Sequence, residues 1–453
     1  MTNKKFPEDP KQYSATAVAN NGLLDRRLLL KSGLSFVAAS FTASQINAAE
    51  LAADPQQKID LANPPWMKTP GAPFSNYGKP SVHEEDVVRY PAANSQVSGN
   101  GSSWTPLHEL EGMITPNGLH FERHHNGVPQ IDPNLHRLLI HGLVKQDSLF
   151  SIEDLLRYPM RSKICFLECG GNSNAGFNKR PVGASVGYFH GLVSCSEWTG
   201  IPLSVLLDEV GVDKKGLWLI AEGADAFAMN ISIPMEKAMD DALLAIYQNG
   251  ERLRPENGYP LRLILPGWEG VMNVKWLRRL TVAESPVMAR NETARYTELL
   301  PSGKANMFSM EMEAKSLITS PSSGMRLHQT GLYQITGLAW SGSGKVSKVE
   351  VSADGGETWA EAALQSPILE KCFTRFRIPW QWDGQASVLK SRVTDESGYI
   401  QPEREELLAQ RGRHGFFHYN AIVTWAVDRE GYVTHIYDEE NNDNNANLDA
   451  DWD

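Results

Sequence analysis

The stretch Ile164-Cys165-Phe166-Leu167-Glu168-Cys169-Gly170-Gly171-Asn172 decides the fold of this chain. An apolar run that ends in a glycine pair predicts a short strand followed by a backbone without side-chain bulk. Cys169 lies at that junction, where its sulfur can face a large ligand, because glycine lets main chain approach a cofactor closely. The alternative is that Cys169 is a buried small hydrophobe, the usual state of a free cysteine. Cys165 lies inside the apolar run, and we interpret it only as a buried small hydrophobe.

The composition of the 453-residue chain is that of an ordinary globular protein with two or three domains. Its formal net charge of −11 argues against nucleic acid as the main partner. The 4 cysteines are too few for a disulfide framework. No C-x-x-C-H motif occurs, so we expect no c-type haem in this chain, and the cysteine and histidine spacings complete no zinc site.

Residues 1–49 are predicted to form a twin-arginine signal peptide. Arg26 and Arg27 precede a short, moderately apolar run and an alanine-rich end at Ala49. A short buried helix is the alternative, but the run contains glycine and serine and is too short to span a membrane. The twin-arginine route moves folded proteins. The signal therefore predicts a periplasmic protein, without a membrane span, whose cofactor is inserted before export.

The rest of the chain divides into four predicted segments: an extended arm (50–104), an α+β domain (105–285), an immunoglobulin-like β-sandwich (286–437) and an acidic disordered tail (438–453). The α+β domain alternates short apolar strands with short helices and has no Gly-x-Gly-x-x-Gly motif, so nothing supports a dinucleotide site. In the sandwich, the alternating run Val346 to Ser352 meets the turn residues Asp354-Gly355-Gly356, which predicts a hairpin.

Ordered motifs in the α+β domain carry a resemblance to a known family. They are Phe121-Glu122-Arg123-His124-His125, the Cys169 stretch, Glu222-Gly223-Ala224-Asp225, Gly258-Tyr259-Pro260-Leu261-Arg262, and Asn273-Val274-Lys275-Trp276-Leu277-Arg278-Arg279. In order and spacing they resemble the sulfite oxidase family of molybdopterin enzymes. The hairpin at Asp354 is similar to one in that family's dimerisation domain. The resemblance implies a sulfite-oxidase-type molybdopterin domain followed by an immunoglobulin-like domain that forms a homodimer.

The resemblance also implies roles for individual residues. Cys169 would be the thiolate ligand to molybdenum, because soft sulfur suits this metal. Arg123 would hold anionic oxygen at the substrate pocket, although a surface ion pair is the plain alternative. Arg375 matches a position where an arginine reaches back from the sandwich to the active site. This match is less secure, because Arg377 lies on the same strand.

The remaining roles concern the pterin and its phosphate. The cofactor-binding residues implied by the resemblance are Phe121, Arg123, His125, Cys169, Asp225, Arg262, Asn273, Val274 and Lys275. Arg262 and Lys275 suit phosphate oxygens, and Asp225 can accept hydrogen bonds from pterin N–H groups. Asp225 could instead be a plain turn residue.

Three positions depart from the pattern of sulfite oxidases. Asn174 stands where the family has an arginine, Met229 where it has an active-site tyrosine, and Asn257 where it has a histidine. We interpret this as a pocket that has lost a cation and a phenol. Such a pocket suits neutral or carrier-bound sulfur better than a small dianion, because a buried unpaired charge is costly.

These departures resemble the sulfane dehydrogenase branch of the family. That resemblance implies oxidation of a sulfane sulfur on a cysteine of a carrier protein in periplasmic thiosulfate oxidation. Electrons would pass to a c-type cytochrome subunit, in a hetero-oligomer. The alternatives are a direct sulfite dehydrogenase with a cytochrome acceptor, a cofactor-free interaction module on the same scaffold, and a reductase acting on oxidised methionine.

Overall fold

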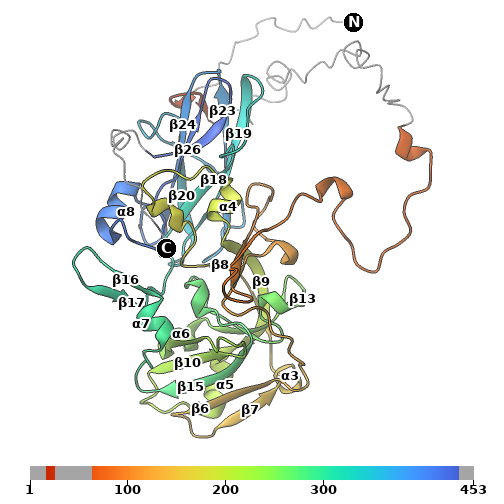
Figure 1. Cartoon of the computed structure of the whole chain (residues 1–453), viewed down its shortest axis with the longest axis vertical. Helices are drawn as coiled ribbons and strands as arrows, with labels where there is room; N and C mark the ends of the chain where they lie inside the picture. Colours follow the sequence, from red (N-terminus) through yellow and green to blue (C-terminus); the bar gives the residue numbers. More distant parts are fainter. Residues whose placement is uncertain (1–16, 26–63, 438–453) are drawn as a thin grey trace, which may run out of the picture.

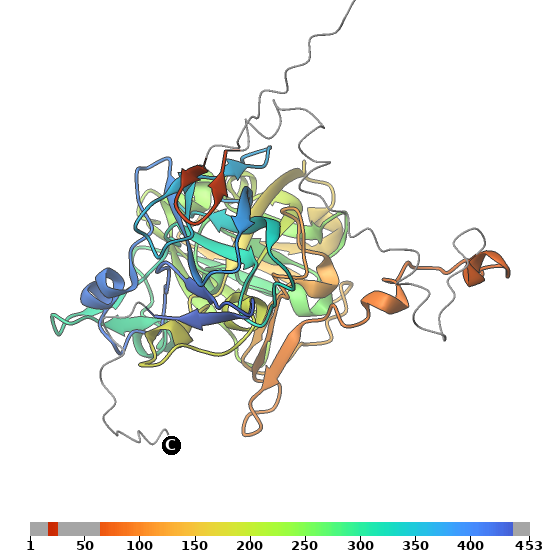
Figure 2. The same cartoon turned by 90° about the horizontal axis from the view of Figure 1, so that it is seen from above.

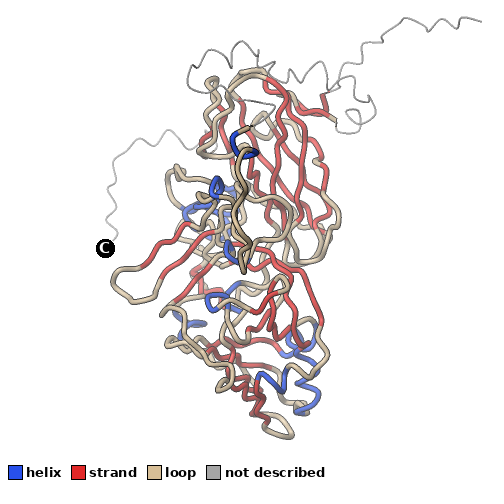
Figure 3. The backbone as a smooth tube through the Cα atoms, turned by 90° about the vertical axis from the view of Figure 1, so that its right-hand side faces the viewer, coloured by secondary structure: helices blue, strands red, loops and turns tan. Residues whose placement is uncertain are grey.

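A computed structural model of the chain describes residues 17–25 and 64–437 (Figure 1). The described chain forms two lobes, and Figure 3 shows strands in both, with helices as short connecting segments. Most of the predicted signal peptide and the whole predicted tail lie outside the described residues. Within the described ranges, no helix is long and apolar enough to cross a membrane.

The first lobe contains two five-stranded sheets. One has the order β11-β10-β15-β6-β7, in which β15 and β6 are parallel and the other pairs are antiparallel. The second has the order β13-β12-β9-β8, with β14 also paired to β12. The strands of the first sheet are β6 (Arg137–Gly142), β7 (Ser148–Ser151), β10 (Trp218–Gly223), β11 (Asn230–Pro234) and β15 (Leu277–Ala283). Those of the second are β8 (Arg161–Glu168), β9 (Val193–Pro202), β12 (Leu243–Gln248), β13 (Glu251–Arg252) and β14 (Arg262–Ile264).

Short helices connect the strands of both lobes. They are α3 (Ile152–Leu155), α4 (Val186–His190), α5 (Leu203–Val210), α6 (Met235–Asp240), α7 (Arg290–Ala294) and α8 (Arg404–Arg411), with 3-10 turns at Pro65–Met67, Val82–Glu84, Asn117–Leu119, Asn174–Phe177, Pro255–Asn257 and Gly270–Met272. Helix α5 buries Leu203, Leu206, Leu207 and Val210, an apolar face at helical spacing. It ends at Gly211, whose φ of 66° is left-handed and is easily adopted by glycine.

The second lobe is a β-sandwich of two antiparallel sheets, as the sequence predicts. One sheet has β18 (Lys315–Ser320), β19 (Gly331–Trp340), β22 (Ala363–Leu364) and β23 (Thr374–Trp382). The other has β20 (Val346–Ser352), β21 (Ala360–Glu361), β24 (Ser387–Asp395), β25 (Thr424–Val427) and β26 (Val433–Ile436). The predicted hairpin is present between β20 and β21, and Thr358 donates both its backbone N–H and its hydroxyl to the Asp354 carboxylate.

The core of the sandwich extends into the first lobe. Phe166 of β8 and Val193 and Cys195 of β9 belong to the same buried cluster as Trp340 and Phe373. The two lobes therefore share apolar packing directly beneath the strand that leads to Cys169, and burial of this kind is the main stabilising contribution in a fold.

Residues 17–25, which fall within the predicted signal peptide, form two strands on the sandwich. Strands β1 (Ala17–Ala19) and β2 (Leu23–Leu24) make a hairpin at the end of the sheet that contains β23 (Figure 2). Leu23 is fully buried and pairs with Trp380. The backbone oxygen of Asn21 accepts from Trp380 Nε1 at 2.7 Å, and that of Gly22 accepts from the Gln381 N–H at 2.8 Å.

The end of the predicted arm belongs to the first lobe. Strand β4 (Gly101–Trp104) pairs with β3 (Tyr90–Ala93) on one edge and with β5 (Glu122–His124) on the other, in a small sheet. A further hairpin, β16 (Thr297–Leu299) and β17 (Ala305–Met307), lies between the lobes in sequence. The arm therefore ends by supporting the strand that carries Arg123.

Candidate active site

Two cavities meet at Cys169. The inner cavity offers about 80 Å³ to a water-sized molecule, and the outer cavity offers about 780 Å³. The residues that line both are Arg123, His125, Cys169 and Tyr296. A group bound to the Cys169 sulfur would therefore face both cavities.

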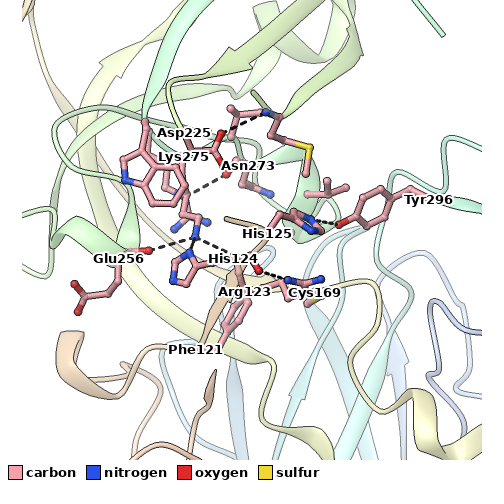
Figure 4. A pocket seen from close by; sticks show the side chains of 16 residues that line it. Phe121, Arg123, His124, His125, Cys169, Asp225, Glu256, Asn273, Lys275 and Tyr296 are labelled. Carbon is pink, nitrogen blue, oxygen red and sulfur yellow. Dashed lines mark hydrogen bonds between the residues drawn. The ribbon is translucent and has the colours of Figure 1, made fainter. Parts of the chain in front are cut away.

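The inner cavity gathers nine of the ten predicted site residues (Figure 4). They are Phe121, Arg123, His125, Cys169, Asp225, Arg262, Asn273, Val274 and Lys275. Each of them lies within a strand or within a few residues of its end, and the strands concerned are β5, β8, β10, β14 and β15. The strand ends thus bring five separate sequence motifs to one point.

Cys169 follows the last residue of β8, where the predicted change from strand to bare backbone occurs. Its N–H donates to the Leu192 oxygen at 2.9 Å, and its own oxygen accepts from the Asn172 N–H at 2.8 Å. A Cβ atom on Gly170 would overlap the carboxylate of Glu269, so this position has no room for a side chain. Burial raises the pKa of the Cys169 thiol to about 11, so a bound metal would have to displace its proton.

The residue before Cys169 is held by both lobes. The buried Glu168 carboxylate accepts from Trp340 Nε1 at 2.7 Å and from Asn172 Nδ2 at 2.8 Å. Lys315 Nζ lies 3.5 Å from Glu168 Oε1, the oxygen that also accepts from Asn172, and donates to Ser173 Oγ at 2.6 Å. These contacts fix the loop that carries the thiol.

Strand β5 presents Arg123 and His125 to the cavities. Arg123 Nη1 contacts Asn100 Oδ1 at 3.4 Å and the backbone oxygen of His124. Burial and then the Arg123 charge lower the pKa of His125 to about 3, so its imidazole is neutral at ordinary pH. The His125 ring stacks on Phe227, with ring centroids 4.3 Å apart.

Two buried cations give the inner cavity the chemistry of an anion site. Arg262 is 5% exposed, and burial lowers its pKa to about 9. Its guanidinium donates to backbone oxygens of Asn257 and Asn273, and Lys275 Nζ donates to those of Arg123 and Glu256. Burial and the Arg262 charge lower the pKa of Lys275. A bound phosphate would offset the cost of burying these two positive charges close together. The residues therefore fit a pterin with an anionic tail.

Asn273 and Asp225 shape the cavity differently. The Asn273 side chain accepts from the Leu265 N–H at 2.7 Å and donates to the Glu269 oxygen at 3.0 Å, so its amide is engaged by backbone. Asp225 Oδ1 accepts from the Met229 N–H at only 3.4 Å. The Asp225 carboxylate therefore keeps acceptor capacity for N–H groups of a ligand.

Arg375 does not line either cavity, contrary to expectation. Its guanidinium donates to the backbone oxygens of Leu110 and Gly112 and to Thr319 Oγ1. Arg377, two residues on, instead pairs with Glu111 at 2.7 Å. Both arginines thus hold the loop around residue 111 against the sandwich, because side chains two apart on a strand share a face.

Comparison with known proteins matches both lobes. The family model of the oxidoreductase molybdopterin binding domain matches residues 125–291, and that of the Mo-co oxidoreductase dimerisation domain matches residues 306–425. Mitochondrial sulfite oxidase from Mus musculus is 32% identical over 391 residues, which cover 80% of this chain and 69% of that protein.

The chain belongs to the sulfite oxidase family of molybdopterin enzymes. An inducible nitrate reductase from Glycine max is 32% identical over 352 residues, 67% of this chain and 39% of that one. A crystal structure of the sulfane dehydrogenase SoxCD from Paracoccus pantotrophus matches with a TM-score of 0.80 and 44% identity, covering 82% of this chain and 96% of that one. The predicted α+β molybdopterin domain with an immunoglobulin-like sandwich is thereby confirmed, and the chain is a molybdopterin oxidoreductase.

The three departures from the sulfite oxidase pattern occupy different places. Asn174 lines the outer cavity and Met229 lines the inner one. Asn257 is buried and donates from Nδ2 to Gln248 Oε1 at 2.9 Å, outside the lining of either cavity. The first two substitutions therefore change the surface that a ligand meets.

Sequence reasoning missed a group of lining residues that lie beyond residue 285. The outer cavity is also lined by Arg290, Arg295, Tyr296, Phe416 and Phe417. They come from α7, the segment after it and the loop after α8. No local pattern distinguished them, because the fold alone brings these segments over Cys169.

Proposed function

We propose that the protein oxidises a sulfane sulfur bound to a cysteine of a carrier protein, in periplasmic thiosulfate oxidation, and passes electrons to a c-type cytochrome subunit. When bound, the molybdenum–pterin group supplies two-electron oxidation of sulfur and transfer of an oxygen atom from water. The proposal extends the family assignment by naming the substrate, and it is supported by the 44% identity to the sulfane dehydrogenase SoxCD.

The shape of the outer cavity is the observation that carries this proposal. Its walls include Trp104, Tyr188, Phe189, Phe416 and Phe417, and it is far wider than the inner cavity. Tyr188 and Phe416 are 46% and 51% exposed, so aromatic surface continues to the mouth. Wide apolar walls suit a sulfur that arrives on a flexible peptide better than a small hydrated dianion.

The chain's own residues would bind and orient the substrate. Arg123 lies beside Cys169 at the junction of the cavities, where its fixed guanidinium can hold oxygen atoms that gain negative charge during oxidation. Arg290 and Arg295 line the outer cavity as exposed cations, where they would attract an anionic carrier. Aromatic walls would exclude water around the sulfur.

The partners follow from the same assignment. The sandwich would form a homodimer, as the name of its family model suggests, and the cytochrome would complete a hetero-oligomer. Residues 1–49 would act as the twin-arginine signal that delivers the folded enzyme to the periplasm. Fusion of these residues to a folded reporter tests export: loss of export in the Arg26→Lys, Arg27→Lys variant supports the signal, and unchanged export contradicts it.

A turnover comparison tests the substrate. Purified holoenzyme with its cytochrome would receive either free sulfite or a carrier protein loaded with a cysteine persulfide, and cytochrome reduction would be followed. The proposal expects the loaded carrier to be the better substrate by kcat/KM. The unloaded carrier is the matched control. Faster reduction by sulfite would favour a direct sulfite dehydrogenase, and a metal-free protein from a cofactor-competent host would favour an interaction module.

A further inference from the structure

Two buried thiols from different lobes meet at the boundary between the lobes. Cys195 lies on β9 of the first lobe, and Cys372 lies two residues before β23 of the sandwich. Their exposed fractions are 0% and 1%. Their sulfur atoms are 3.5 Å apart, although 177 positions separate the two residues in the chain. Both are free thiols in the structure, and neither lines the inner or the outer cavity, so this contact is separate from the active site.

Hydrogen bonds and an ion pair hold both cysteines in place. The Cys195 N–H donates to Thr115 Oγ1 at 3.1 Å, and the Cys195 oxygen accepts from the Thr115 N–H at 2.7 Å. Next to Cys372, the Lys371 oxygen accepts from the Phe166 N–H of β8 at 3.0 Å, and Lys371 Nζ lies 2.8 Å from the Asp241 carboxylate. Phe166 is paired with Cys195 in the register of β8 and β9. The contact between the two sulfurs is therefore a fixed feature of the boundary between the lobes.

The geometry and surroundings of the pair suit a bond between the two sulfurs. A disulfide bond of about 2.05 Å requires the sulfur atoms to approach by about 1.5 Å from their separation of 3.5 Å. Rotation about the two Cα–Cβ bonds moves the sulfurs by such a distance while the backbone stays in place. Both residues belong to the apolar cluster that contains Trp340 and Phe373. A disulfide inside this cluster would be shielded from reducing agents.

We propose that Cys195 and Cys372 form a disulfide that joins the two lobes when the protein meets an oxidising compartment. The oxidant is a disulfide of the surroundings, carried by a small molecule or by a protein. One thiol of the pair, as its thiolate, attacks that disulfide and releases one thiol from it, and the second thiol of the pair then displaces the other. The pair loses two electrons and two protons, which end on the two thiols of the reduced oxidant. The inference is independent of the sulfur substrate.

Burial determines when this step occurs. Burial and then the hydrogen bond with Cys372 raise the pKa of Cys195, so the closed protein holds almost no thiolate at this position. Attack on an oxidant therefore requires the lobes to separate transiently at this boundary, and we expect oxidation to be slow. Once formed, the bond opposes that separation and closes a long loop of the chain, which stabilises the folded state.

Peptide mapping tests the inference on the full chain. Enzyme exported to the periplasm of a cofactor-competent host would be alkylated in denaturant at lysis, digested without reductant and analysed by mass spectrometry. We expect the peptides of Cys195 and Cys372 to be linked and Cys165 to be alkylated. The matched control is the Arg26→Lys, Arg27→Lys variant retained in the cytoplasm, in which all three cysteines should be alkylated. Free thiols at both positions in the exported enzyme, or a link to Cys165, would overturn the inference.

Thermal unfolding measures the effect of the bond. Reduction of the exported holoenzyme with a phosphine should lower its unfolding midpoint by about 3–5 °C, because the unfolded chain loses a long closed loop. Cys165→Ala should show the same shift, and the double variant Cys195→Ala, Cys372→Ala should show none. An equal effect of the phosphine on the wild type and the double variant would contradict a bond between these two residues.

A chain that does not reach the periplasm would count against the proposed signal peptide and not against this inference. The purified holoenzyme would then be equilibrated with oxidised glutathione and mapped in the same way. A link between Cys195 and Cys372 would support the inference, and free thiols at both positions would overturn it.

Discussion

Lys315 Nζ lies 3.5 Å from the Glu168 carboxylate, and the two residues come from different lobes. Both side chains are almost fully buried, at 1% and 2% exposure. Glu168 precedes the thiol that is predicted to bind molybdenum. The sandwich thus fixes part of the active site and is more than an assembly domain.

Lys315→Met should destabilise the whole enzyme. The change leaves the Glu168 carboxylate buried without its cation, which typically costs about 3–5 kcal/mol. The exposed Lys304→Met is the matched control and should change stability by less than about 0.5 kcal/mol. Calorimetric unfolding of the holoenzyme measures both. Equal midpoints for the two variants would contradict the prediction, and the double variant Lys315→Met, Glu168→Gln should recover part of the loss.

Cys169→Ser should lower turnover by more than about a hundredfold. Loss of a residue that only orients a metal ligand typically costs about 10- to 100-fold in activity, and loss of the ligand itself should cost at least as much. Pterin content should persist, because the other lining residues remain. Cys165→Ala, on β8 four residues before Cys169 and outside both cavities, should keep near wild-type turnover per folded molecule. A Cys169→Ser protein with full turnover and an unchanged molybdenum absorption spectrum would show that this sulfur is not the ligand.

Arg262→Gln should reduce the pterin retained after purification by about tenfold, because a buried guanidinium makes strong hydrogen bonds to phosphate. Arg252→Gln is a suitable control: that guanidinium is exposed and lies over the Tyr247 ring, 4.8 Å from its centroid. Fluorescence of the oxidised, released pterin quantifies the content. Equal retention by both variants would place the phosphate elsewhere.

Stability should fall as the pH drops below 6.5. Burial lowers the pKa of His435 to about 4 and that of His120 to about 3, so both are neutral in the folded protein. The unfolded chain takes up these protons first, so the stabilisation is complete above the unfolded pKa of about 6.5 and is lost as the pH falls toward 4.

His435→Gln tests this pH dependence at a ring that lines neither cavity. The variant should show a shallower fall in unfolding midpoint between pH 6.5 and 4 than the wild type, at about 1.4 kcal/mol for each pKa unit removed. His328→Gln, at an exposed histidine, should leave the slope unchanged. Parallel slopes for wild type and His435→Gln would rule out a contribution from this ring.

Local sequence patterns predicted the residues of the inner cavity better than they predicted which distant segments pack over Cys169. The nine inner-cavity residues lie on motifs at strand ends, where glycine and polar residues follow apolar runs. Such patterns can be recognised in the sequence without knowledge of the fold. Arg375 lines neither cavity, because its position on the strand determines the face of its side chain but not which loop packs against that face. Tyr296 was missed because it lies past the predicted domain boundary at residue 285, and only the tertiary fold brings the segment after α7 to Cys169.

The β1–β2 hairpin has a consequence for maturation. If processing removes residues 1–49, it also removes the cover that Leu23 provides over Trp380 and frees the part of the β23 edge that β22 does not pair with. A bare strand edge invites pairing with another chain. Precursor and processed enzyme would then differ in the surfaces that are free for assembly. A signal peptide that is usually regarded only as a targeting sequence would also delay association until export is complete.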